Sequence, residues 1–74
     1  MPLLPVVSGR DVVAALQRVG FEVHHQTDSH VIMRHRGLAR RADVPLHREL
    51  KRGTLRGILR QSGITVADFI DLLN

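Results

Sequence analysis

Apolar side chains recur at helical spacing near the start of the chain. Val12 and Leu16 lie four residues apart, and the next valine on the same face follows three residues later. Ser8 precedes this run as a favourable N-cap, and Gly20 follows it as a residue that tolerates the left-handed conformation ending many helices. The pattern predicts a first helix over residues 10–19.

The apolar period then shortens to two residues, which is the spacing of β-strands. Alternation predicts strands over residues 21–26 and 30–35, and residues 27–29 have the Thr, Asp and Ser side chains that favour a turn between them. Strict alternation in the first strand places Val23 and His25 on the same face. The two strands are predicted to form a hairpin.

After this hairpin the sequence predicts a third strand and a second helix. Residues 38–44 form a weaker strand, and Pro45 ends it because proline has no N–H group for further pairing. Polar residues lead into a helix that begins between Lys51 and Thr54 and ends at Gly63.

A short third helix follows. Four apolar residues from Val66 to Leu73 recur at i, i+3, i+4 and i+7, and Thr65 precedes them as a capping residue. The element order α-β-β-β-α-α predicts an α+β fold, in which a three-stranded antiparallel sheet has its helices packed on one face.

Composition narrows the class of protein. The 74 residues allow one domain, residues 1–74, in which residues 1–7 form a loose N-terminal segment. The absence of cysteine excludes disulfides and thiolate zinc sites, and it favours the reducing cytoplasm as the compartment. Apolar runs are far shorter than the roughly 20 residues of a membrane span, so we expect no interaction with a membrane.

Positive charge is concentrated in the second half of the chain. Residues 34–60 contain nine basic and two acidic residues, whereas the whole chain has a net charge of +4. Most of the basic residues are arginines, whose planar guanidinium matches a phosphate group, so the cluster favours a nucleic acid as partner. Charge alone leaves an acidic protein or a membrane surface open as well.

Histidine is the candidate for acid–base chemistry. The five histidines offer no convergent set with a well-spaced carboxylate, so we expect no metal and no other cofactor. His30 differs from the others because it follows Ser29 at a turn leading into a strand, where a side chain is held firmly yet stays open to a ligand. Imidazole exchanges a proton near neutral pH, although periodicity alone does not separate this role from a structural one.

Five short motifs follow one another along the chain. They are Ser8-Gly9 at a helix start, Gly20-Phe21 at its end, Ser29-His30 at the start of the second strand, Val44-Pro45-Leu46-His47 after the third strand, and Arg52-Gly53-Thr54-Leu55-Arg56-Gly57-Ile58-Leu59 entering the second helix. In this order and at this spacing they resemble the HicA family of toxin endoribonucleases.

The resemblance implies a double-stranded-RNA-binding-domain-like fold, cleavage of mRNA, and a HicB-type antitoxin as protein partner. The family's catalytic histidine falls on His30, and its Gly-Ser-His motif falls on Asp28-Ser29-His30. Asp28 therefore stands where the family has glycine. Aspartate tolerates a positive φ better than most residues, so the turn is expected to persist, and its carboxylate either orients the imidazole or repels the phosphate.

Together these observations suggest a toxin of a type II toxin–antitoxin system that acts as a metal-independent mRNA interferase. His30 takes the proton of a ribose 2′-OH that attacks the adjacent phosphorus, and Ser29 orients the imidazole. His47 is the candidate proton carrier for the 5′-oxygen, with a purely structural loop role equally open. The residues expected to contact RNA are Arg34, Arg40, Arg41, Lys51, Arg52, Thr54 and Arg56.

Two other functions stay open from the sequence. One is a catalytically weakened RNA-binding module, in which Asp28 has disabled cleavage while the basic face remains. The other is a protein-interaction adaptor without a role in RNA binding. Cleavage of RNA in EDTA and the salt dependence of RNA affinity distinguish these alternatives.

Overall fold

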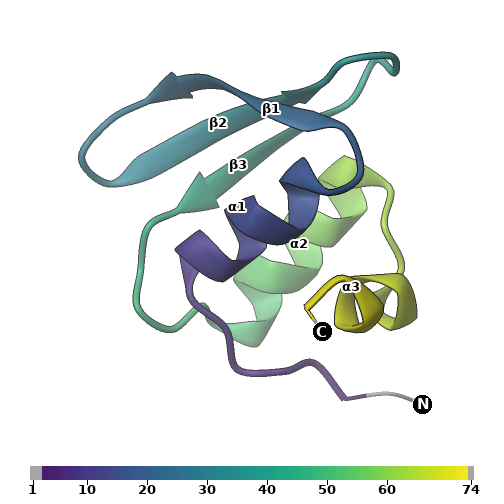
Figure 1. Cartoon of the computed structure of the whole chain (residues 1–74). Helices are drawn as coiled ribbons and strands as arrows, with labels where there is room; N and C mark the ends of the chain where they lie inside the picture. The colour runs from purple at the N-terminus through teal and green to yellow at the C-terminus, as the bar shows by residue number, and fades with distance from the viewer. Residues whose placement is uncertain (1–2, 74) are drawn as a thin grey trace.

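A three-stranded antiparallel sheet lies above all the helices (Figure 1). The computed structural model describes residues 3–73. The elements are α1 (Gly9–Gln17), β1 (Phe21–Gln26), β2 (His30–His35), β3 (Arg41–Pro45), α2 (Arg52–Ser62) and α3 (Val66–Leu73). The order α-β-β-β-α-α confirms the predicted α+β fold.

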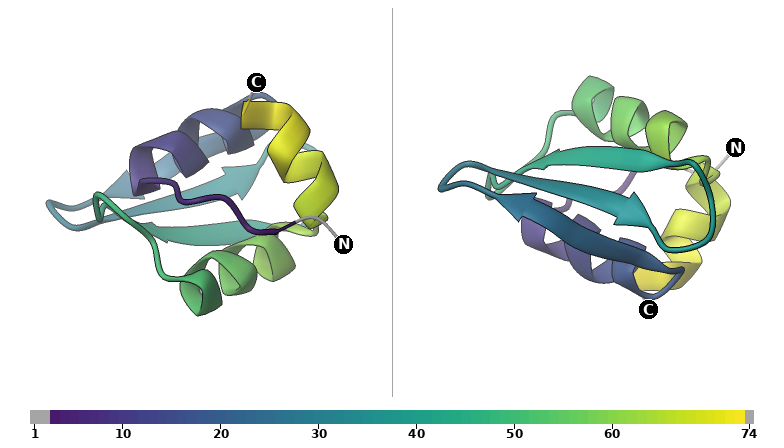
Figure 2. Two further views of the ribbon diagram at one scale, coloured as in Figure 1. Left: turned by 90° about the horizontal axis from the view of Figure 1, so that it is seen from below. Right: turned by 90° about the horizontal axis from the view of Figure 1, so that it is seen from above.

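The helices cover one face of the sheet and leave the other open. Helices α1 and α2 run along the underside of the sheet, and α3 closes one end of this layer (Figure 2). In the view from above, the three strands lie in front of the helices, and no element covers them. We call this uncovered surface of β1, β2 and β3 the open face of the sheet.

The ends of the helices follow the predicted capping chemistry. The Ser8 hydroxyl accepts a hydrogen bond from the N–H of Asp11, and the Asp11 carboxylate accepts one from the N–H of Ser8, each at 3.1 Å. Gly63 ends α2 in the left-handed conformation, with φ 77° and ψ 21°. The Thr65 hydroxyl accepts a hydrogen bond from the N–H of Asp68 at 3.1 Å and so caps α3.

Strand β1 contains a bulge that the alternation of the sequence did not predict. Val23 pairs with Met33, but the next pair is His25 with Ile32, so His24 is left over between them. The extra residue reverses the direction of every side chain beyond it. His25 therefore shares the open face with Ile32, and its predicted place on the face of Val23 was wrong.

Strand β3 is shorter at its start than predicted, running from Arg41 rather than residue 38. The reason is that the preceding turn uses its N–H groups elsewhere: Gly37 and Leu38 both donate to His35 Nδ1, each at 3.0 Å. Pro45 is the last residue of β3 and pairs with His30. Pro45 thus belongs to the strand and is its last residue, whereas the sequence predicted that the strand stops before it.

The hydrophobic core lies between the sheet and the helices. Its largest fully buried side chains are Val12, Leu16, Met33, Val44, Leu55 and Phe69. Leu4 and Val7 are also buried in this cluster, and the N–H of Leu50 donates to the carbonyl of Val7 at 2.9 Å. The segment over residues 1–7, expected to be loose, therefore packs on the core at these two positions; residues 1 and 2 lie outside the described residues.

The helices of the described residues do not include a membrane span. Over residues 3–73 every helix is too short or too polar to cross a bilayer.

Candidate active site

Thr27 holds the β1–β2 turn together through its hydroxyl group and its backbone N–H. The Thr27 hydroxyl accepts hydrogen bonds from the N–H of His30 at 3.1 Å and from the N–H of Ser29 at 3.4 Å, and it donates to the carbonyl of His30 at 3.5 Å. The N–H of Thr27 also donates to the carbonyl of His30 at 2.9 Å. The turn over residues 27–30 is therefore fixed by hydrogen bonds between its first residue, Thr27, and its last residue, His30.

His30 projects from this turn into solvent. Its neighbour Val31 is buried, and the alternation along β2 directs His30 to the open face of the sheet. Its Nδ1 lies 2.9 Å from the Ser29 hydroxyl. Among residues 3–73, no group forms a hydrogen bond with His30 Nε2, so this nitrogen is available to a ligand.

The end of β3 meets this turn through the backbone. The N–H of Leu46 donates to the carbonyl of Ser29 at 2.8 Å, and the carbonyl of His47 accepts from the N–H of Gly9 at 2.9 Å. Gly9 admits no side chain here, because a Cβ would collide with the carbonyl oxygen of Pro45. The side chain of His47 is exposed. The structure thus brings the backbone of His47 to the end of the sheet that carries Ser29 and His30.

Asp28 sits in the turn without the backbone conformation that would require glycine. No residue other than glycine has a positive φ in the described part of the chain. The exchange of the family's glycine for Asp28 therefore imposes no left-handed strain. Its exposed carboxylate adds a negative charge two residues before His30.

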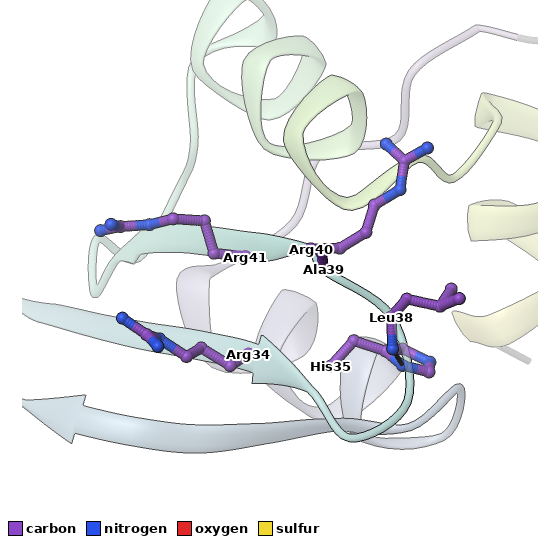
Figure 3. A pocket seen from close by; sticks show the side chains of 6 residues that line it. All are labelled: Arg34, His35, Leu38, Ala39, Arg40 and Arg41. Atoms are coloured by element: carbon purple, nitrogen blue, oxygen red, sulfur yellow. Dashed lines mark hydrogen bonds between the residues drawn. The ribbon is translucent and has the colours of Figure 1, made fainter.

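The basic residues expected to contact RNA do not form one continuous patch. Arg34 and Arg41 pair with each other across β2 and β3 on the open face. In Figure 3 their side chains extend in the same direction, whereas Arg40 points toward α2. Arg40 packs at the left-handed Gly63, where a Cβ would lie 2.8 Å from the guanidinium carbon. The guanidinium group of Arg40 therefore lies at the carbonyl end of α2 and points in a different direction from those of Arg34 and Arg41, although all three residues line one hollow.

The remaining predicted contacts gather at the start of α2. Lys51 is the N-cap of the helix but makes no side-chain capping bond, and the first turn contains no acidic residue. Lys51, Arg52, Thr54 and Arg56 are all exposed. A helix start has free N–H groups and a positive partial charge, so basic side chains there destabilise the free protein and favour a bound anion.

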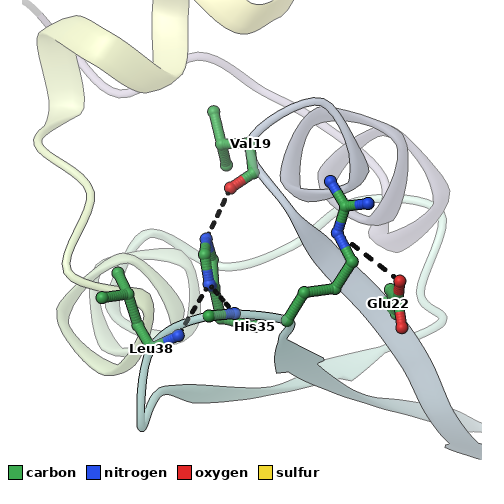
Figure 4. A network of polar contacts seen from close by, with 6 residues as sticks. Val19, Glu22, His35 and Leu38 are labelled. Carbon is green, nitrogen blue, oxygen red and sulfur yellow. Dashed lines mark hydrogen bonds and ion pairs between the residues drawn. The ribbon is translucent and has the colours of Figure 1, made fainter.

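His35 occupies the other end of β2 and is structural. Its Nε2 lies 2.8 Å from the carbonyl oxygen of Val19, and its Nδ1 accepts from two backbone N–H groups (Figure 4). Its ring meets Phe21 edge-on, with centroids 5.1 Å apart. Both ring nitrogens are occupied, so His35 has no nitrogen for a ligand.

The described residues contain no cluster of side chains that could ligate a metal ion. Within residues 3–73 no three His, Asp or Glu side chains are placed to hold one ion. Thr27 is the residue of this site whose role the sequence did not reveal, because it was assigned only to a turn. A threonine at the first position of a tight turn, whose hydroxyl can bond to the following backbone, is the signal that could have revealed it.

Comparison with known proteins identifies a family of bacterial toxins. Residues 9–64 match the family model of the HicA toxin of bacterial toxin–antitoxin systems. The chain belongs to this family, which confirms the resemblance of its motifs. Membership implies an antitoxin as a partner. A search among curated proteins found no match.

Proposed function

We propose that the chain is an endoribonuclease toxin, an mRNA interferase that cleaves RNA without a metal ion. The observation that carries this proposal is His30, an exposed imidazole with one nitrogen bonded to Ser29 and the other free. The resemblance of Asp28-Ser29-His30 to the Gly-Ser-His motif of the HicA family supports this assignment. Its mRNA substrate would place its action in the cytoplasm, and residues 1–74 would act as one toxin domain.

The proposed reaction is an internal transfer at phosphorus. The ribose 2′-oxygen forms a bond to the adjacent phosphorus, the bond from phosphorus to the 5′-oxygen breaks, and the products are a 2′,3′-cyclic phosphate and a 5′-hydroxyl end. His30 Nε2 accepts the proton of the 2′-OH. This role needs the tautomer with hydrogen on Nδ1, in which the Ser29 hydroxyl accepts from Nδ1. Ser29 thereby orients the ring as a base.

A proton must also reach the departing 5′-oxygen. His47 is our candidate donor, because the backbone bond between Leu46 and Ser29 brings its segment to the same end of the sheet. The exposed Lys51 and Arg52, with the N–H groups that open α2, would hold a phosphate of the same RNA. Thr54 and Arg56 extend this surface along the first turns of the helix.

A HicB-type antitoxin would inhibit the toxin by covering this site. Lys51, Arg52 and Arg56 have no acidic partner among residues 3–73. Acidic side chains of an antitoxin would pair with these cations and occupy the place of RNA. Inhibition would then be direct competition for charge, and added salt should weaken it.

Cleavage of a ribose substrate in EDTA tests the proposed function. We expect the purified chain to cut RNA at neutral pH, to leave a 2′,3′-cyclic phosphate detectable by mass spectrometry, and to spare an oligonucleotide with 2′-O-methyl groups throughout. His30→Ala should be inactive with an unchanged far-UV circular dichroism spectrum. Intact RNA with retained, salt-sensitive binding would instead identify an RNA-binding module. Absence of both cleavage and binding would leave the adaptor function.

A further inference from the structure

The open face of the sheet contains a pair of arginines whose positive charges are only partly paired with carboxylates. Arg34 and Arg41 are direct register partners on β2 and β3, and both are exposed. Like charges directly opposite each other in a sheet destabilise it. The pair therefore lowers the stability of the free protein unless something negative lies between or above the two guanidinium groups.

Neighbouring carboxylates balance this pair only in part. Arg41 forms an ion pair with Asp43 at 2.9 Å. Glu22 lies opposite Arg34 on β1, but its carboxylate is paired with Arg36 at 3.5 Å. Arg34 consequently has no acidic partner among residues 3–73. An excess of positive charge remains at this point of the open face.

The surface at this place is hollowed rather than flat. A hollow of about 310 Å³ beside the β2–β3 turn is lined by Arg34 and Arg41 and also by His35, Leu38, Ala39 and Arg40 (Figure 3). The guanidinium groups of Arg34 and Arg41 extend along the strands, away from this turn, whereas Arg40 points toward α2. Two guanidinium groups that extend in the same direction from paired strand positions can donate to the oxygens of a single phosphate group.

The arginine pair lies on the same face of the same strand as His30. His30, Ile32 and Arg34 are alternate residues of β2, and Ile32 is half-buried between the two exposed residues. Four residues of a strand span about 13 Å. A stacked nucleic-acid strand advances about 3.4 Å per nucleotide, and an extended one further, so the span corresponds to roughly two to four nucleotides.

We propose that Arg34 and Arg41 form a second phosphate subsite, which binds single-stranded RNA two to four nucleotides from the bond cleaved at His30. The proposal rests on the proposed function and adds the path of the substrate: RNA lies along the open face over β2, with Ile32 offering an apolar surface to a base. Arg40 is not part of the subsite, because it is directed toward α2.

Substrate length separates this subsite from the cleavage centre. A dinucleotide reaches only His30, whereas a hexanucleotide reaches the arginine pair in at least one direction. For the hexanucleotide, Arg34→Gln should raise KM about five- to tenfold with little change in kcat, as expected for loss of an exposed charge-assisted contact. For the dinucleotide it should leave kcat and KM unchanged. Arg41→Gln should behave like Arg34→Gln.

Arg60→Gln is the matched control, because Arg60 is also exposed but lies in the last turn of α2. It should leave the KM of both substrates unchanged. Arg34→Gln should not lower the melting temperature, since it removes a like-charge contact. An equal rise in KM for dinucleotide and hexanucleotide, or equal effects of Arg34→Gln and Arg60→Gln, would overturn the subsite.

Binding of an uncleavable strand tests the subsite independently of catalysis. A fluorescent hexanucleotide with 2′-O-methyl groups should bind the wild-type chain about five- to tenfold more tightly than Arg34→Gln, and the variant should show a smaller salt slope by about one phosphate contact. This result would support the subsite even if the chain cleaved no RNA, which would refute only the proposed function. Equal affinities of the two proteins, or a preference for a duplex of the same sequence, would overturn it.

Discussion

Two histidines stand at opposite ends of β2 and differ in how many of their ring nitrogens are bonded. His35 has both ring nitrogens bonded to backbone groups, of Val19 on one side and of Gly37 and Leu38 on the other. His30 is exposed, has one nitrogen bonded to a hydroxyl, and leaves the other free. The ring of His35 joins the α1–β1 connection to the β2–β3 turn, whereas the ring of His30 joins nothing beyond its own turn.

The difference shows what makes a histidine available for chemistry. The two residues are the first and the last of the same strand, and both are next to a turn, so residue type and local pattern are similar. What differs is the number of backbone groups that the fold brings to each ring. An imidazole with both nitrogens occupied stabilises the structure, and one with a free nitrogen can exchange a proton with a substrate.

Removing the imidazole at position 30 should give the largest effect, and the effect should be on activity. His30→Ala is expected to lower the rate of RNA cleavage by about 10²- to 10⁴-fold, the usual contribution of an acid–base residue. The free energy of unfolding should change by less than about 0.5 kcal/mol, because the ring is exposed and bonds only to Ser29. Urea denaturation beside a cleavage assay measures both quantities. A stability loss as large as that of His35→Ala would contradict the distinction between the two residues.

Removing the imidazole at position 35 should instead reduce stability. His35→Ala loses three hydrogen bonds and the edge contact with Phe21, which together are worth about 2–4 kcal/mol. Cleavage per folded molecule should stay near the wild-type value. His25→Ala is the control, because the His25 side chain is exposed and has no hydrogen-bond partner among the described residues. Equal unfolding curves for the two variants would contradict the structural role of His35.

A smaller effect is expected from the hydroxyl that fixes the turn of His30. Thr27→Val keeps the branched shape but loses the hydroxyl contacts to Ser29 and His30. We expect kcat to fall about tenfold with KM unchanged, since misplacing a catalytic group affects the transition state more than binding. Thr27→Ser should restore kcat. Failure of the serine variant to restore it would contradict the assignment of the effect to the hydroxyl.

The smallest effect is expected at Asp28, which lies in the turn two residues before His30. Asp28→Asn removes a negative charge from the approach of the phosphate, so KM for RNA should fall about two- to threefold. Asp28→Gly should lower KM similarly but reduce the free energy of unfolding by about 0.5–1 kcal/mol, because glycine gives the unfolded chain more freedom. Steady-state kinetics and urea denaturation distinguish the two. A rise in KM for both variants would show that the carboxylate assists RNA binding.

Much of the fold could be predicted because its signals are local. The Ser8–Asp11 cap lies within one helical turn, and the left-handed Gly63 ends α2 where the sequence predicted. The hairpin of β1 and β2 followed from period-two alternation around residues 27–29. Each of these features depends on side chains within a few residues of one another, so the order of residues alone carries the information.

Other features could not be predicted because they depend on distant residues. Arg40 was grouped with Arg34 and Arg41, but its contact with Gly63 at the end of α2 separates it from them. The bulge at His24 changed the face of His25, because pairing with β2 overrides simple alternation. Thr27 was seen as a turn residue, and its bonds to Ser29 and His30 appear only in the folded turn.

The order of the elements, their caps, the family and the position of the candidate histidine could all be read from the sequence, since these depend on neighbours along the chain. The folded chain was needed to show which imidazole keeps a free nitrogen and which arginines share a face. Those properties depend on backbone groups and strand register brought together from separate parts of the chain. The structural role of His35, for example, depends on a hydrogen bond between its ring and the carbonyl of Val19, sixteen residues away.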